Sequence, residues 1–116
     1  MEPIIEAYIK GKRISKAYYV DGGAQICVMS ERLKNQIGME VSGPSTYRAK
    51  PANNVIVKCV GVINCVKINV CGVEVAVDVY IMPLKREGYP MILGRSWLIS
   101  MQAKQDWETG LLVLKP

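Results

Sequence analysis

The sequence contains no histidine, which removes the usual way in which a serine or cysteine is activated as a nucleophile. A hydrolase built on this chain therefore depends on carboxylates. The cysteines form no C-x-x-C pair, so the common zinc and haem spacings are also missing. We expect no metal and no cofactor. The four cysteines are Cys27, Cys59, Cys65 and Cys71, and we expect small buried thiols in a reducing compartment instead of a disulfide framework.

Long apolar runs and targeting signals are lacking as well. No apolar stretch reaches the roughly 20 residues that span a bilayer, and no basic segment followed by a hydrophobic one opens the chain. We expect a soluble, untargeted protein without a membrane partner.

The chain has no concentrated patch of basic sequence. Lysine and arginine number 15 against 10 acidic residues, which gives a formal charge of +5. These basic residues are scattered between Lys10 and Lys115, without the tract or arginine-rich helix that marks a nucleic-acid-binding face. A solvated basic surface explains the pattern better, and we do not expect nucleic acid as a primary partner.

The length limits the kind of active site that one copy can form. At 116 residues, we expect a single domain over 1–116, with a modest core but without two lobes and a cleft between them. A deep active site would then require two copies of the chain.

What the sequence has in quantity is β-strand signal. Residues 4–10 and 14–20 are short β-prone runs separated by residues 11–13, which indicates a hairpin. Apolar and polar residues alternate over 66–70 and 73–80, on either side of the turn at Cys71-Gly72. Each of these strands buries one face, which predicts a small sandwich or a partly closed barrel.

The remaining segments predict one short helix and several turns. Ser30 as N-cap, with Gly38 as the stop, favours a helix over residues 30–37. Residues 42–54 are rich in turn formers and lie between two extended arms.

The last third predicts a strand, a short helix and a hairpin. A strand at 91–93 stops at Gly94 and is followed by one or two helical turns through Trp97, Leu98 and Met101. A closing hairpin is predicted from residues 102–107 and 111–114 around a turn at 108–110.

Asp21 is the first candidate for chemistry. It follows an apolar strand, stands on a Gly22-Gly23 step, and shares the chain with only two other aspartates, Asp78 and Asp106. An acid in this setting is either a capped turn residue or a carboxylate held in place for a reaction. Neither Asp78 nor Asp106 is followed by a comparable glycine turn.

Two motifs carry a resemblance to a known family. The stretch AYYVDGGAQICVMSERL, with MILGRSWL about 70 residues downstream, resembles the paired signature of retroviral-type aspartic proteases (retropepsins), especially those of plant LTR retrotransposons. In that family one apolar strand ends in Asp-Thr/Ser-Gly-Ala and another ends in Ile-Leu/Ile-Gly-Arg. The resemblance covers nearly the whole chain. It implies an all-β, retropepsin-like acid-protease fold, a small closed β-barrel or sandwich with a flap hairpin and one or two short helices.

The resemblance also implies an activity. It suggests an aspartic endopeptidase that works as a homodimer and cleaves a retroelement polyprotein, bound as an extended peptide, through a water activated by the two Asp21 carboxylates. The enzyme would act in the cytoplasm or within retroelement particles. Both ends of the chain run into strand-like sequence, which favours excision of the domain itself from a polyprotein.

By the same resemblance, individual residues take on roles. Gly22, Gly23 and Ala24 would complete the catalytic loop, and residues 47–57 would form a flap over the substrate. The residues expected to contact substrate are Gln25, Tyr47, Ala52, Asn53, Asn54, Val55, Tyr80 and Met82, and those expected to support the site are Ile92, Leu93, Gly94 and Arg95.

Two positions depart from the family pattern and leave alternatives open. Gly22 stands where the family has a threonine or serine that braces the dimer, and Gln25 replaces an acid that pairs with the arginine, here Arg95. A catalytically silent member of the fold, kept for dimerisation or peptide binding, is therefore the alternative function. A basic β-barrel that binds nucleic acid is a third.

Overall fold

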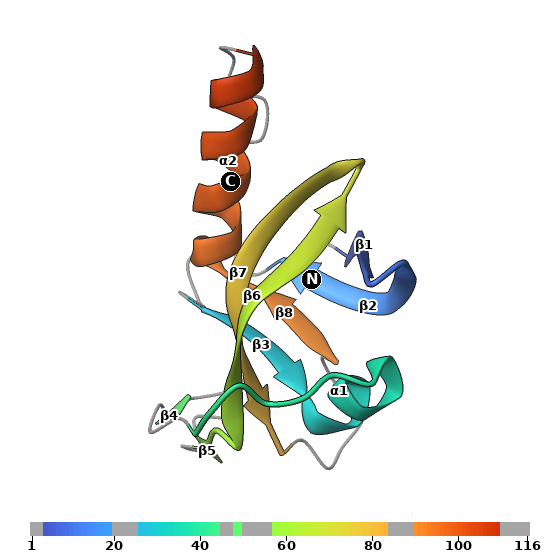
Figure 1. Cartoon of the computed structure of the whole chain (residues 1–116), viewed down its shortest axis with the longest axis vertical. Coiled ribbons are helices and arrows are strands. Elements are labelled where there is room, and N and C mark those ends of the chain that lie inside the picture. The colour runs from blue at the N-terminus through green and yellow to red at the C-terminus, as the bar shows by residue number, and fades with distance from the viewer. Residues whose placement is uncertain (1–3, 20–25, 45–47, 50–56, 84–89, 110–116) are drawn as a thin grey trace.

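The computed structural model describes residues 4–19, 26–44, 48–49, 57–83 and 90–109. Six strands close a barrel in the order β1-β2-β8-β3-β7-β6, while β4 and β5 pair with each other. In Figure 1, α2 stands out from one end of the barrel and α1 lies near the other. The elements are β1 (Ile4–Ile9), β2 (Lys12–Tyr19), β3 (Cys27–Ser30), α1 (Glu31–Ile37), β4 (Arg48–Ala49), β5 (Val57–Lys58), β6 (Gly61–Val70), β7 (Val73–Met82), β8 (Met91–Leu93) and α2 (Arg95–Thr109).

Two hairpins supply four of the six barrel strands, as the sequence predicts. β1 pairs with β2, and β6 pairs with β7, both antiparallel. Lys10 and Gly11 form the first turn and Cys71 and Gly72 the second, and all four have positive φ angles. Two consecutive positive φ values are the requirement of the two-residue turn whose twist matches that of the strands. The predicted turn at 71–72 is confirmed, while the first turn lies one residue earlier than predicted.

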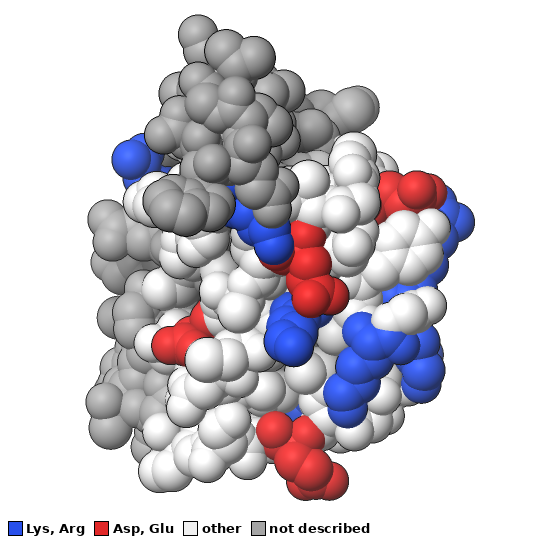
Figure 2. All heavy atoms as spheres, turned by 45° about the horizontal axis from the view of Figure 1, so that its top comes forward, with Lys and Arg blue, Asp and Glu red and all other residues white. Residues whose placement is uncertain are grey.

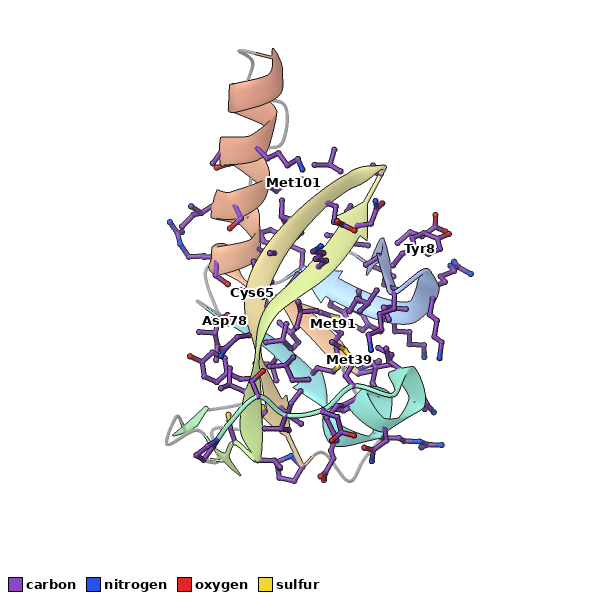
Figure 3. The ribbon with its side chains drawn as sticks, viewed as in Figure 1. Tyr8, Met39, Cys65, Asp78, Met91 and Met101 are labelled. Atoms are coloured by element: carbon purple, nitrogen blue, oxygen red, sulfur yellow. The ribbon has the colours of Figure 1, made fainter. Side chains whose placement is uncertain are left out.

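A bulge bends β6 in its middle. The register with β7 shifts between Ile63 and Val66, and Cys65 has a φ of 55°. Two side chains satisfy the backbone here: the N–H of Cys65 donates to Asp78 Oδ1 at 3.0 Å, and the N–H of Asn64 donates to Ser42 Oγ at 3.0 Å. Figure 3 shows Asp78 beside Cys65. Asp78 therefore stabilises the bulge in β6 by accepting a backbone hydrogen bond.

The short helix α1 begins and ends as its sequence predicts. Ser30 is the N-cap and accepts the N–H of Leu33 at 3.1 Å. Gly38 follows the helix with a φ of 82° and donates its N–H to the carbonyls of Lys34 and Asn35. Leu33 and Ile37 are the buried residues of the helix and pack against the core.

The closing hairpin predicted for the last third is wrong. Residues 102–107 belong to α2, which runs from Arg95 to Thr109 over 15 residues, far longer than one or two turns. Two causes favour the helix. No glycine or proline interrupts this stretch, and most of residues 101–105 are good helix formers. The other half of that hairpin, 111–114, lies outside the described residues.

Most of the buried apolar side chains, from the strands and from both helices, form the main core. Trp97, Met91, Leu93 and Ile68 are among its most completely buried members, and Figure 3 places Met91 inside the barrel. The expectation of buried thiols holds for Cys27 and Cys59 only, because Cys65 and Cys71 are exposed. All four are free cysteines. Within the described ranges, no helix is long and apolar enough to cross a membrane.

Charged side chains of both signs share the surface. Arg13 and Glu6 form an exposed ion pair at 3.3 Å, and acidic groups lie among the basic ones on the face drawn in Figure 2. The described residues on that face therefore show charges of both signs, and not the single-sign patch with which proteins attract a nucleic-acid backbone.

Candidate functional site

The barrel topology brings the strands that carry the two sequence motifs together at one end of the barrel. β8 lies between β2, to which it is parallel, and β3, to which it is antiparallel. Ile92 is paired with Tyr18 on one side and with Val28 on the other. The last residue of β2 and the first residue of β3 therefore flank the last residue of β8. The end of β2 and the start of β3 are about two strand spacings, or about 10 Å, apart. Residues 20–25 connect these two ends.

Part of the predicted site lies outside the described residues. This applies to the whole predicted catalytic loop and its neighbour, Asp21, Gly22, Gly23, Ala24 and Gln25, and to the predicted flap contacts, Tyr47, Ala52, Asn53, Asn54 and Val55. The short β4–β5 pair, Arg48↔Lys58 and Ala49↔Val57, lies at the base of the predicted flap. The structure describes the other six predicted residues.

The predicted supporting residues differ in their environment. Leu93 is fully buried and Gly94 is buried, while Ile92 is partly exposed. The carbonyl of Gly94 accepts the N–H groups of Trp97 and Leu98 at 3.1 and 3.3 Å, so the end of β8 also begins α2. Arg95 is exposed, and its side chain makes no ion pair within the described part of the chain. Its predicted partner Gln25 is not among the residues described.

Two contacts that the sequence did not predict join the strand ends that flank residues 20–25 to the first turn of α2. Cys27 Sγ lies 3.5 Å from Ser96 Oγ, in a hydrogen bond in which either atom could be the donor. The rings of Tyr19 and Trp97 are 5.9 Å apart between centroids and inclined by 56°, a tilted aromatic contact. The one available signal was position, because Tyr19 and Cys27 lie within the first of the two quoted stretches and Ser96 and Trp97 within the second.

An apolar row crosses three strands on the outside of the main core. Val28 is paired with Tyr80 of β7 and with Ile92 of β8. These three side chains form a separate cluster with Ile26, Cys59 and Met82. The predicted substrate contacts Tyr80 and Met82 are therefore brought together with Ile92, and Val28 and Cys59 join them without having been predicted. Such a row can hold apolar side chains of a ligand.

Burial raises the pKa of the Cys27 thiol above its usual value, and the hydrogen bonds to Ser96, Gly94 and Trp97 lower it by less. The native protein therefore holds this proton to a higher pH than the unfolded chain does. The associated stability is complete below the unfolded pKa of about 8.5 and is lost as the pH rises toward the folded value.

This difference in pKa predicts a steeper alkaline loss of stability in the wild type than in Cys27→Ser. We expect urea unfolding between pH 7 and 10 to show a smaller fall in the free energy of unfolding for Cys27→Ser, because the variant has no thiol at this position. Cys71→Ser, which removes an exposed thiol, serves as the control and retains the wild-type fall. Equal slopes for Cys27→Ser and the wild type would contradict the assignment.

A separate groove of about 570 Å³ lies between the β1–β2 turn and the middle of β6. Its walls include Tyr8, Lys10, Met39, Cys65 and Lys67, and it contains none of the predicted site residues. Among the described residues, no group of histidine, cysteine, aspartate or glutamate side chains is arranged to hold a metal ion.

Comparisons with known proteins identify a family and a similar fold. A family model described as "gag-polyprotein putative aspartyl protease" matches residues 5–100. A solved structure, the retroviral protease-like domain of Ddi1 from Leishmania major, is similar with a TM-score of 0.62. It is 18% identical in sequence, and the similarity covers 84% of this chain and 75% of that chain. This likeness confirms the expected all-β, retropepsin-like fold. A comparison with curated proteins finds no match.

Proposed function

The chain belongs to the gag-polyprotein aspartyl protease family, and from this premise we propose that it is an aspartic endopeptidase that works as a homodimer. The observation that carries the proposal is the placement of β8 between β2 and β3. Residues 20–25, which include Asp21, connect β2 to β3. The Ile92-Leu93-Gly94-Arg95 motif lies where β8 terminates, at the same end of the barrel.

Two copies of Asp21 supply the chemistry. Two carboxyl groups about 3 Å apart cannot both ionise, so they share one proton. The ionised carboxylate removes a proton from a water molecule, whose oxygen attacks the carbonyl carbon of the peptide. The protonated partner donates to the carbonyl oxygen. The C–N bond of the tetrahedral intermediate then breaks, and the nitrogen takes up the proton that the first carboxylate removed from water. A hydroxyl of the intermediate returns its proton to the partner carboxylate, so that the pair again shares one proton.

The second aspartate comes from a second copy. Asp78 lies exposed on β7 and accepts the N–H of Cys65 in the β6 bulge, which gives it a structural role. Asp106 falls within α2, a helix that begins at the site edge and leads away from it. A pair of identical aspartates on a twofold axis satisfies the requirement with one sequence.

The proposed substrate is an extended segment of a retroelement polyprotein. Its backbone would add as a strand beneath the flap of residues 47–57. The row of Val28, Tyr80 and Ile92, with Met82 beside it, favours apolar side chains in the substrate near the cleavage site. The place of action would be the cytoplasm or the retroelement particle.

Cleavage of a peptide library near pH 5, blocked by a statine-type inhibitor, tests the proposal. Gly22 lacks the hydroxyl of the family's Thr or Ser, and this observation supports one competing function, a silent peptide-binding module. That module would bind library peptides without turnover.

The shared proton predicts a bell-shaped dependence of kcat/KM on pH. The acidic limb appears because protonation of both aspartates removes the base, and the alkaline limb because loss of the shared proton removes the acid. Both limbs belong to the pair. The measurement is initial cleavage rates from pH 3 to 8 at constant ionic strength. A rate that stays flat from pH 4 to 8 would be incompatible with a carboxylate pair.

A further inference from the structure

The first turn of α2 contacts both strand ends that lead into residues 20–25. Trp97 contacts Tyr19, the last residue of β2. Ser96 is hydrogen-bonded to Cys27, the first residue of β3. Cys27 and Trp97 are almost fully buried, with 0% and 1% of their surface exposed, and Tyr19 is 8% exposed. Ser96 and Trp97, neighbours in α2, thus contact the strand ends on both sides of residues 20–25.

We propose that Ser96 and Trp97 are positioning residues for the proposed reaction, because they fix the two strand ends between which Asp21 stands. The inference rests on the proposed function. Asp21 is only two residues beyond Tyr19, so a displacement of this strand end is passed to the carboxylate through few rotatable bonds. In a homodimer both copies of Asp21 would be displaced in the same way. A misplacement of a reacting group by about 1 Å can lower the rate on the order of a hundredfold.

The Cys27–Ser96 bond separates positioning from plain structural support. A thiol is a weak hydrogen-bonding group that tolerates an apolar environment, so loss of the bond costs little stability. The bond nevertheless joins residues 69 positions apart in the sequence. A loss of activity that far exceeds the loss of stability is therefore the signature of a positioning role.

The Tyr19–Trp97 contact supplies the second fastening. Trp97 lies wholly within the core, and its Nε1 has no hydrogen-bond partner among the described residues. Packing, and not a hydrogen bond within this part of the chain, therefore holds the indole ring. A tilted pair of large rings restricts both side chains to one arrangement, which fixes the end of β2 against the helix.

The test compares three variants with a matched control. Ser96→Ala and Cys27→Val each remove the hydrogen bond, and Cys27→Ser retains a bonding group. Ile68→Val is the control, because it removes one methyl from a fully buried residue of β6, a strand that does not pair with β2, β8 or β3. For each protein, kcat, KM and the pH limbs are measured on a peptide that the wild type cleaves, and hydrogen exchange is followed in fragments that cover residues 20–26.

We expect kcat to fall by about tenfold in Ser96→Ala and Cys27→Val, with KM changed by less than about twofold. A double variant that combines Ser96→Ala with Cys27→Val should be no slower than the slower single variant, because both substitutions remove the same interaction. The pH limbs should shift in these variants. Cys27→Ser should recover most of the rate, and Ile68→Val should keep it. Hydrogen exchange in residues 20–26 should be faster in Ser96→Ala than in the wild type and unchanged in Ile68→Val.

Equal kcat values and equal exchange in Ser96→Ala and Ile68→Val would overturn the inference. If the wild type itself cleaves no peptide, the proposed function fails, and exchange alone decides whether Ser96 holds residues 20–26. Unchanged exchange in Ser96→Ala would then overturn the positioning role, and accelerated exchange would support it.

Discussion

Replacing Asp21 with asparagine abolishes peptide cleavage, with an expected fall in kcat on the order of 10³-fold or more. An amide can neither remove a proton from water nor share a proton with its counterpart across the twofold axis. The substitution changes neither the size of the side chain nor the apolar core, so the fold and the dimer persist. The measurement is single-turnover cleavage, with circular dichroism and sedimentation as checks on fold and association.

Asp78→Asn is the matched control for this experiment. It makes the same chemical change at an exposed position on β7, where the amide oxygen can still accept the N–H of Cys65. Asp78→Asn should cleave peptide at nearly the wild-type rate. Wild-type-like activity in Asp21→Asn, or inactivity in both variants, would contradict the assigned mechanism.

Mixing the two forms of the protein tests whether the site is shared. If each active site needs Asp21 from both copies, an equal amount of Asp21→Asn protein captures about half of the wild-type chains in inactive mixed dimers. Activity per wild-type chain should then fall to about half after equilibration. Activity that does not change in the mixture would show that one copy suffices.

Trp97→Ala should lower the free energy of unfolding by about 3–5 kcal/mol. The indole ring is 1% exposed, belongs to the core and contacts Tyr19, so its removal leaves a large cavity. Domains of this size are stable by only about 5–15 kcal/mol, so the variant loses between about a fifth and the whole of the stability of the wild type. Urea denaturation with circular dichroism measures the change.

Two further variants identify the cause of this loss. Trp97→Phe keeps an aromatic ring and removes the Nε1–H that lacks a partner in the described part of the chain, so it should cost less than half as much as alanine. Ile99→Ala, on the same helix but 57% exposed, should change stability by no more than about 0.5 kcal/mol. If Ile99→Ala were as destabilising as Trp97→Ala, the loss could not be assigned to the cavity that the buried Trp97 ring leaves, because alanine itself favours the helix at both positions.

The sequence predicts those elements whose local signals and tertiary roles agree. Alternation in residues 66–70 and 73–80 marks a hairpin because each strand buries one face, and the caps Ser30 and Gly38 mark α1 because they complete its backbone hydrogen bonds. The prediction of a strand at residues 102–107 was wrong because the sequence at 108–110 is compatible with two structures. A Glu-Thr-Gly sequence can turn a hairpin, and a glycine also commonly follows the end of a helix, as Gly110 follows Thr109.

For the site, the sequence predicts which motifs matter but not what holds them. The DGGA and ILGR motifs are local and can be found by inspection. The contacts of Ser96 with Cys27 and of Trp97 with Tyr19 depend on β8 lying between β2 and β3. No periodicity reveals that order, because pairing between strands about 70 residues apart leaves no local signal in a single sequence.

The insertion of β8 between β2 and β3 also sets the order of events during folding. The β1–β2 and β6–β7 hairpins need only neighbouring residues and can form early, whereas β8 is three residues long and gains its partners only from strands made much earlier in synthesis. Closing such long loops is slow. A nascent chain that ends before Met91 therefore holds Asp21 without β8 or the helix turn that fastens both ends of its loop. The proposed site can be completed only after translation has passed Trp97, which would separate production of the chain from the onset of the proposed activity.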